Sequence, residues 1–148
     1  MRFLVDANIL IYARESPAAA KVKREVATEW LTELARREFL QTNLQVLNEV
    51  CHAALRKLRH MSPDDVRSWV GELAAFGDTP IDAEDVARAW DVREAYRFSW
   101  FDCLILSSAD RLGCTHVLTE DMGSPRRVGP LHLINPFAVL PGDLLSTS

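Results

Sequence analysis

The sequence predicts one α/β domain, built from a small parallel central sheet with helices on both faces. Short apolar strands alternate with helical patterns along the whole chain, an order typical of parallel β-α-β units. Acidic residues follow two of the expected strands, where open parallel sheets place their ligand sites. A length of 148 residues suits one hydrophobic core, so we expect residues 1–148 to form a single domain.

The expected strands are short apolar runs rich in Val, Ile, Leu and Phe, bounded by polar or turn residues. A further segment at residues 79–81 is expected to be extended but brief. Strands this short fit a small sheet covered on both faces. They cover residues 2–5, 39–42, 115–119 and 131–134.

Helices are predicted between the strands because apolar residues recur there every three or four positions. Pro17 and Pro63 stand at expected first helical positions, and Gly77 and Gly113 are expected to end two helices. The helices cover approximately residues 9–13, 18–37, 44–60, 63–77, 83–95 and 100–113. Residues that favour the N-cap precede four of them: Ser16, Ser62, Asp82 and Ser99.

The composition is that of an ordinary soluble protein, with 48% hydrophobic and 26% charged residues. No apolar stretch approaches the ~20 residues of a membrane span. Asp6 interrupts the first apolar run, which argues against a signal peptide, so we expect a cytoplasmic protein. Cys51, Cys103 and Cys114 lie in apolar contexts without zinc spacing, which indicates reduced, buried thiols rather than a catalytic thiol.

Asp6 and Glu49 are acidic residues in apolar surroundings. Asp6 ends the first strand, where a carboxylate is buried unless something pairs with it. It could instead cap the following helix, but Asn8 could also do that, so we favour a ligand role for Asp6. Glu49 interrupts an apolar helix pattern, and its alternative is a boundary side chain that reaches water.

Asp102 and Asp121 are acids whose local patterns have structural explanations too. Ser99 and Asp102 have the spacing of a capping box, so Asp102 could serve as a first-turn acid, as a site residue, or as both. Asp121 lies in a turn before Gly123, and Glu120 competes with it for the inward position.

These four acids have one chemistry in common. Hard divalent cations such as Mg²⁺ or Mn²⁺ prefer carboxylate oxygens, and carboxylates placed together repel one another unless a cation neutralises them. Such an ion can activate water and stabilise charge on a phosphodiester. The sequence therefore predicts a metal site formed by Asp6, Glu49, Asp102 and Asp121, and it leaves open whether one or two ions bind.

The chain resembles the PIN-domain nucleases and, within them, the VapC-type toxins of bacterial toxin–antitoxin pairs. The first matching stretch is Phe3-Leu4-Val5-Asp6-Ala7-Asn8-Ile9-Leu10, which spans the end of the first strand and the residues after it. The stretch after Asp121, residues 123–127, departs from the family, which often carries a further acid there. The other matches are Leu47-Asn48-Glu49-Val50, Ser99-Trp100-Phe101-Asp102-Cys103-Leu104-Ile105, Leu118-Thr119-Glu120-Asp121-Met122 and Ile134-Asn135-Pro136-Phe137.

The resemblance implies a PIN-like fold and a Mg²⁺- or Mn²⁺-dependent endoribonuclease. It implies that the four acids form the catalytic metal site, that Asn8 orients Asp6, and that Thr119 hydrogen-bonds the cluster. It also implies cleavage of single-stranded or structured RNA by metal-activated water, which leaves a 3′-hydroxyl and a 5′-phosphate. The partners that it implies are a second copy of the chain and a small antitoxin that inserts into the active-site groove.

Binding of RNA is not favoured by the overall charge, which is −4. A cation in the acidic cluster or a local basic face has to compensate. His60 and Arg93 lie beside basic residues that could contact RNA. The basic residues at the end of helix 44–60 could instead complement the negative end of the helix dipole. The candidates for RNA contact are Arg56, Lys57, Arg59, Arg97, Arg126 and Arg127.

Histidines and tryptophans are given structural roles. The histidines lack metal-ligand spacing, and the tryptophans lie at apolar helical positions, which favours core or dimer packing over base stacking. These residues are His52, His60, His116 and His132, with Trp69, Trp90 and Trp100.

Two other functions remain open beside the ribonuclease. One is a catalytically silent PIN-like module for binding or assembly, which the negative charge and the altered residues 123–127 support. The other is a phosphatase or phosphotransfer enzyme that uses the same acids.

Overall fold

A single sheet forms the centre of the computed structural model, which describes residues 1–123 and 126–146. Within these residues the sheet has five strands in the order β2-β1-β3-β5-β4. The strands are β1 (Phe3–Val5), β2 (Leu40–Gln41), β3 (His116–Leu118), β4 (Arg126–Val128) and β5 (Leu131–Ile134).

The strands β2, β1, β3 and β5 run parallel, so their carboxyl ends meet at one edge. Phe3 lies opposite Leu40 on one side and His116 on the other, and His116 lies opposite His132. The expected parallel sheet with helices on both faces is confirmed for these four strands.

The edge strand β4 was not expected from the sequence. It pairs antiparallel with β5, and Val128 lies opposite Leu131. Only Gly129 and Pro130 separate the two strands, and Gly129 adopts a left-handed φ of 56°. Because a parallel crossover needs about a dozen residues or more, this link can form only a hairpin.

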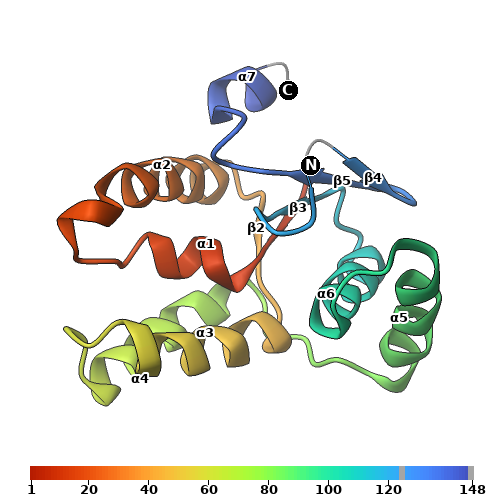
Figure 1. Cartoon of the computed structure of the whole chain (residues 1–148), viewed down its shortest axis with the longest axis horizontal. Helices are drawn as coiled ribbons and strands as arrows, with labels where there is room; N and C mark the ends of the chain where they lie inside the picture. Colours follow the sequence, from red (N-terminus) through yellow and green to blue (C-terminus); the bar gives the residue numbers. More distant parts are fainter. Residues whose placement is uncertain (124–125, 147–148) are drawn as a thin grey trace.

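Helices cover both faces of the sheet (Figure 1), with α2 and α7 on one side and α3 to α6 on the other. Two short 3₁₀ turns, Ala18–Ala20 and Ala74–Phe76, extend α2 and α4. The helices are α1 (Ala7–Tyr12), α2 (Lys21–Arg36), α3 (Leu44–Lys57), α4 (Pro63–Leu73), α5 (Ala83–Tyr96), α6 (Trp100–Arg111) and α7 (Pro141–Leu145).

The helix starts agree with three of the four expected caps. Ser62 and Asp82 each form a complete capping box, and Ser99 accepts a hydrogen bond from the Asp102 backbone. The cap expected at Ser16 is wrong, since α2 is preceded by the 3₁₀ turn and no side chain caps that turn. Three alanines there form the tighter turn, which starts directly after extended Pro17.

The core forms around β1, all of whose residues are fully buried. Trp30 of α2 is also fully buried, and its ring centroid lies 6.1 Å from that of Phe3. The Trp30 indole N–H donates to the carbonyls of Pro136 and Val139, which holds the C-terminal segment against α2.

Other expected core positions differ in outcome. Trp69 is buried, whereas Trp90 is 62% exposed and packs its ring against Trp100 at 4.7 Å. Cys103 and Cys114 are buried free thiols, and Cys51 is a half-buried one. In the described part of the chain, none of the helices has the length and apolar character to cross a membrane.

Candidate active site

A cavity of about 840 Å³ opens beside the carboxyl edge of the sheet. Residues of α1, α3, α6 and the loop after β3 line it. All four acids singled out in the sequence lie on its wall: Asp6, Glu49, Asp102 and Asp121. The fold thus brings together side chains from four separate segments of the chain.

Two of these acids are placed by the parallel strands. Asp6 directly follows β1, and its backbone N–H donates to the carbonyl of Leu118, the last residue of β3. Asp121 lies three residues beyond Leu118, in the loop that leaves the neighbouring strand. Glu49 reaches the same edge from α3, and Asp102 reaches it from the first turn of α6.

Asp6 is the most buried of the four, with 6% of its surface exposed. Burial raises its pKa to about 6; a hydrogen bond from Thr119 opposes this shift, and the charges of Asp102 and Asp121 add to it. The Thr119 hydroxyl donates to Asp6 Oδ2 at 2.9 Å and accepts from the Asp121 backbone N–H. Thr119 therefore links two of the acids through hydrogen bonds, in agreement with the hydrogen bond to the cluster that the resemblance implies.

Glu49 carries the least compensated carboxylate. Its Oε2 is a buried oxygen that has no hydrogen-bond partner among the described residues. Burial raises the pKa of Glu49 to about 7, and the charges of Asp6 and Asp102 contribute, while a hydrogen bond with Gln45 opposes the shift. An unpaired buried carboxylate oxygen is costly, so this atom is suited to binding a cation.

Asp102 combines the two roles considered for it. Its backbone N–H donates to the Ser99 hydroxyl at 3.3 Å, so the residue belongs to the capped first turn of α6. Its carboxylate lines the cavity. Burial raises the pKa of Asp102, Ser99 partly opposes the shift, and the charge of Asp121 adds to it.

Asp121, and not Glu120, faces the cavity. Glu120 accepts a hydrogen bond from the Tyr12 hydroxyl and an ion pair from Lys23 Nζ at 3.0 Å. Asn8 Nδ2 donates to Asp121 Oδ2 at 2.7 Å. The expected orientation of Asp6 by Asn8 is therefore wrong: the α1 turn directs Asn8 to Asp121, and Thr119 takes the role beside Asp6.

The donor set fits a hard divalent cation. Four carboxylates line the cavity, the pKa values of Asp6, Glu49 and Asp102 are raised by burial and by neighbouring carboxylates, and Glu49 has an unpaired buried oxygen. Within residues 1–123 and 126–146, however, no three His, Cys, Asp or Glu side chains lie close enough together to hold a metal ion. Mg²⁺ commonly uses one or two direct carboxylates and retains several waters, so a wide ring of acids suits it.

The basic candidates separate into three groups. Arg56 and Lys57 line the acidic cavity, and Arg56 contacts the His52 ring at 3.3 Å. Arg59 and Arg97 do not line it. Arg126 and Arg127 line a different cavity of about 280 Å³ beside His132, and the Arg126 guanidinium lies 5.0 Å from the centre of the Phe98 ring. The neighbouring residues 124–125 of the atypical stretch lie outside the described residues.

Several cavity residues were not identified from the sequence as site residues. They are Gln45, Asn48, His52, Ser99 and Phe101. Two of them, Gln45 and His52, share a helix face with Glu49 at spacings of four and three residues, and Asn48 directly precedes Glu49. That spacing was the available signal, because residues three and four apart on a helix lie side by side.

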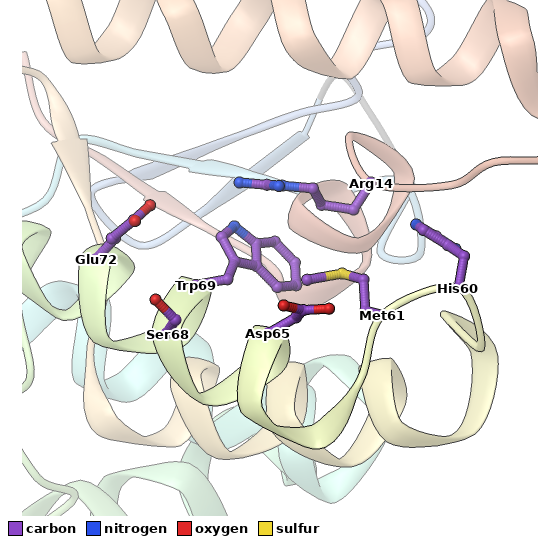
Figure 2. Close-up of a pocket in the computed structure, with 7 residues that line it drawn as sticks. All are labelled: Arg14, His60, Met61, Asp65, Ser68, Trp69 and Glu72. Carbon is purple, nitrogen blue, oxygen red and sulfur yellow. The ribbon is translucent and has the colours of Figure 1, made fainter.

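A second cavity, of about 380 Å³, lies between the end of α1 and α4 and contains none of the four acids. Figure 2 shows the Arg14 guanidinium above the Trp69 ring, 5.1 Å from its centre. Glu72 and Asp65 lie on the same wall. Its mixed charges and lack of a carboxylate cluster make it a poor site for phosphodiester chemistry.

The fold and the site together define an α/β domain with an acidic cavity at the carboxyl edge of a parallel sheet. The model of the PIN domain family matches residues 3–129. The chain therefore belongs to the PIN domain family, and all four acids lie inside the matched range. Comparison with curated proteins gives no match.

Three solved structures illustrate the similarity of fold. The Rickettsia felis VapBC2 complex bound to a promoter DNA fragment matches with a TM-score of 0.63, 18% identity, and 91% of this chain and 98% of that chain covered. A Klebsiella pneumoniae toxin–antitoxin complex matches with a TM-score of 0.60 and 20% identity, and the match covers 90% of this chain and 96% of that chain. Mycobacterium tuberculosis VapC20, a toxin that cleaves the sarcin–ricin loop, matches with a TM-score of 0.61 and 15% identity, and the match covers 88% of this chain and 98% of that chain.

Proposed function

We propose that this PIN-domain protein is a Mg²⁺- or Mn²⁺-dependent endoribonuclease and the VapC-type toxin of a toxin–antitoxin pair. The observation that carries the proposal is the cavity in which Asp6, Glu49, Asp102 and Asp121 meet, with one buried carboxylate oxygen unpaired. The similar structures support it, since one is described as VapBC2, one as a toxin–antitoxin complex, and one as a toxin that cleaves the sarcin–ricin loop.

The four acids would hold the cation, directly or through water. When bound, a divalent ion supplies activation of water and neutralisation of charge at a phosphodiester, which is cleaved to a 3′-hydroxyl and a 5′-phosphate. Thr119 keeps Asp6 in place, and Asn8 does the same for Asp121. Arg56 and Lys57 on α3 offer positive charge to the flanking phosphates.

The partners follow from the same proposal. They are RNA as substrate, a small antitoxin that blocks the active-site groove, and a second copy of the chain in a homodimer. The protein would act in the cytoplasm. The one domain proposed for residues 1–148 would contain the whole catalytic site.

Cleavage of RNA by the purified protein tests the proposal. We expect products with Mg²⁺ or Mn²⁺, none with EDTA, and none from Asp6→Asn. Asp110→Asn is the matched control, since Asp110 is an exposed acid on α6 that lies outside the acidic cavity. Equal cleavage by wild type with and without EDTA and by Asp6→Asn would refute the proposal. Growth arrest on expression of wild type, but not of Asp6→Asn, tests the toxin assignment.

A catalytically silent module is the second candidate, favoured by the negative net charge of −4. Titration with Mn²⁺ separates the two. A working site binds the ion only in the folded state and raises the thermal midpoint as the ion concentration increases. A vestigial site leaves the midpoint unchanged and gives no RNA products.

A further inference from the structure

Phe101 is a large aromatic side chain in the wall of the acidic cavity, and it is 57% exposed. It belongs to neither hydrophobic cluster of the described residues. Its neighbour Trp100, in contrast, packs against the small cluster of Ala89, Cys103 and Leu104. Trp100 therefore contributes to core packing, whereas the ring of Phe101 does not.

The place of Phe101 relative to the charged residues suggests what the ring contacts. It directly precedes Asp102 on α6, and the same cavity contains Arg56 and Lys57 of α3. Through a bound cation the carboxylates can act on one phosphate of a nucleic acid, and the two basic residues can bind the flanking phosphates. They leave its bases without a partner, and an aromatic face is the group on which an unpaired base stacks.

A second copy of this chain would be a poor occupant of this wall, whereas the proposed antitoxin would reach it only as an inhibitor in place of RNA. Covering Phe101 with a second copy would also cover the carboxylates beside it, and charges buried without partners are strongly unfavourable. Interface centres are accordingly depleted of charged residues. A single nucleic-acid strand instead brings an apolar base and a charged backbone together, which matches one aromatic ring amid charged groups.

We propose that Phe101 stacks on an unpaired nucleobase next to the scissile phosphate, and that this contact determines how tightly the site binds an unpaired strand. The inference rests on the proposed ribonuclease function and names a specificity-determining residue for it. A paired base is stacked inside its duplex and cannot present its face to the ring. Duplex RNA would then lose this contact.

The test compares three variants at this position. Phe101→Leu keeps an apolar side chain without a ring, Phe101→Ala removes both, and Phe101→Trp keeps an aromatic face. Because the ring is more than half exposed and outside the core, all three should keep the thermal midpoint of the wild type. The probe is a single-stranded RNA oligonucleotide with 2-aminopurine, used alone and annealed to its complement.

Binding is measured by anisotropy and by 2-aminopurine quenching in Ca²⁺, with intact RNA verified on a gel. We expect Phe101→Leu and Phe101→Ala to bind the single strand about tenfold more weakly and to quench less, because one stacking contact is lost. Phe101→Trp should bind and quench as the wild type does. Binding of the duplex should be the same for all four proteins.

Cleavage in Mn²⁺ by the same proteins separates the inference from the function beneath it. If the wild type cleaves RNA but Phe101→Leu binds and cleaves the single strand equally well, the inference is overturned and the ribonuclease stands. If the wild type does not cleave, both are overturned. A change of oligomeric state in Phe101→Leu, with unchanged RNA binding, would assign the ring to contact with a second chain and overturn the inference.

Discussion

At the scale of single residues, the clustered carboxylates of the acidic site destabilise the folded protein when no cation is bound. Glu49 keeps a buried oxygen without a hydrogen bond, and Asp6 and Asp102 lie close enough to disfavour its charge. Native proteins pair such groups unless they serve a ligand. The folded state without a cation must therefore be less stable than one with a neutral side chain at this position.

Glu49→Gln should stabilise the cation-free protein at pH 8 by on the order of 1–3 kcal/mol. Glutamine removes the repelled charge with almost no change of shape, while it also removes a cation ligand. The measurement is urea unfolding in EDTA and then in Mn²⁺. We expect Mn²⁺ to raise the midpoint of the wild type and to leave that of Glu49→Gln nearly unchanged.

The pH dependence of this effect has a definite sign. The folded-state pKa of Glu49 is raised from 4.5 to about 7, so the wild type pays for the buried charge fully only above about pH 7. The advantage of Glu49→Gln should therefore shrink as the pH falls from 7 toward 4.5. Glu29→Gln, at an exposed glutamate of α2, is the control and should change nothing. An advantage independent of pH would contradict the argument.

At the scale of elements, α5 and α6 are joined by a buried ion pair. Arg111 of α6 donates two hydrogen bonds to the Asp85 carboxylate, at 2.8 and 2.7 Å, and the Asp85 side chain is fully buried. Burial alone would raise the pKa of Asp85, but the bonds from Arg111 and the Asp82 backbone lower it by more. Because α6 also carries Phe101 and Asp102, this pair fixes one wall of the cavity.

Arg111→Met should destabilise the protein by about 2–4 kcal/mol, because it leaves the buried Asp85 carboxylate without its partner. Urea unfolding monitored by far-UV circular dichroism measures the effect. The matched control is Arg88→Met on α5, whose partner Glu84 is exposed; that pair should contribute less than about 0.5 kcal/mol. Equal losses in the two variants would show that the Arg111–Asp85 pair has no special weight.

Elements defined by local signals were predictable from the sequence. The capping boxes at Ser62 and Asp82 use residues three positions apart, so the pattern alone identifies them. The strand β4 was missed because its pairing depends on β5, and its exposed arginines show no apolar alternation. The side chain partners of Asn8 were equally hidden, since they depend on how the loop after β3 folds back over α1.

The site acids were predictable as a set for a different reason. Asp6 and Asp121 follow strands that proved to be neighbours, so strand order alone brings them together. The choice between Asp121 and Glu120 could not be made from the sequence. It depends on Tyr12 and Lys23, which hold Glu120 away from the cavity.

At the scale of the whole molecule, β1 and α7 both pack into the same hydrophobic core. The N-terminal strand β1 lies inside the sheet, and Leu145 of α7 is 1% exposed in the same core cluster as β1. Trp30 holds the segment between β5 and α7 through two hydrogen bonds. We therefore propose that residues beyond the matched range 3–129 belong to the same cooperative domain as the acidic site.

Leu145→Ala tests that proposal at a point remote from the carboxylates. Removing this buried side chain should cost about 2–4 kcal/mol, whereas Leu140→Ala should cost little, because Leu140 is 57% exposed. If the chain unfolds as one unit, tryptophan fluorescence and far-UV circular dichroism will give one coincident, shifted transition, and Mn²⁺ will raise its midpoint. Two separate transitions, with only one sensitive to Mn²⁺, would instead divide the tail from the domain that holds the site.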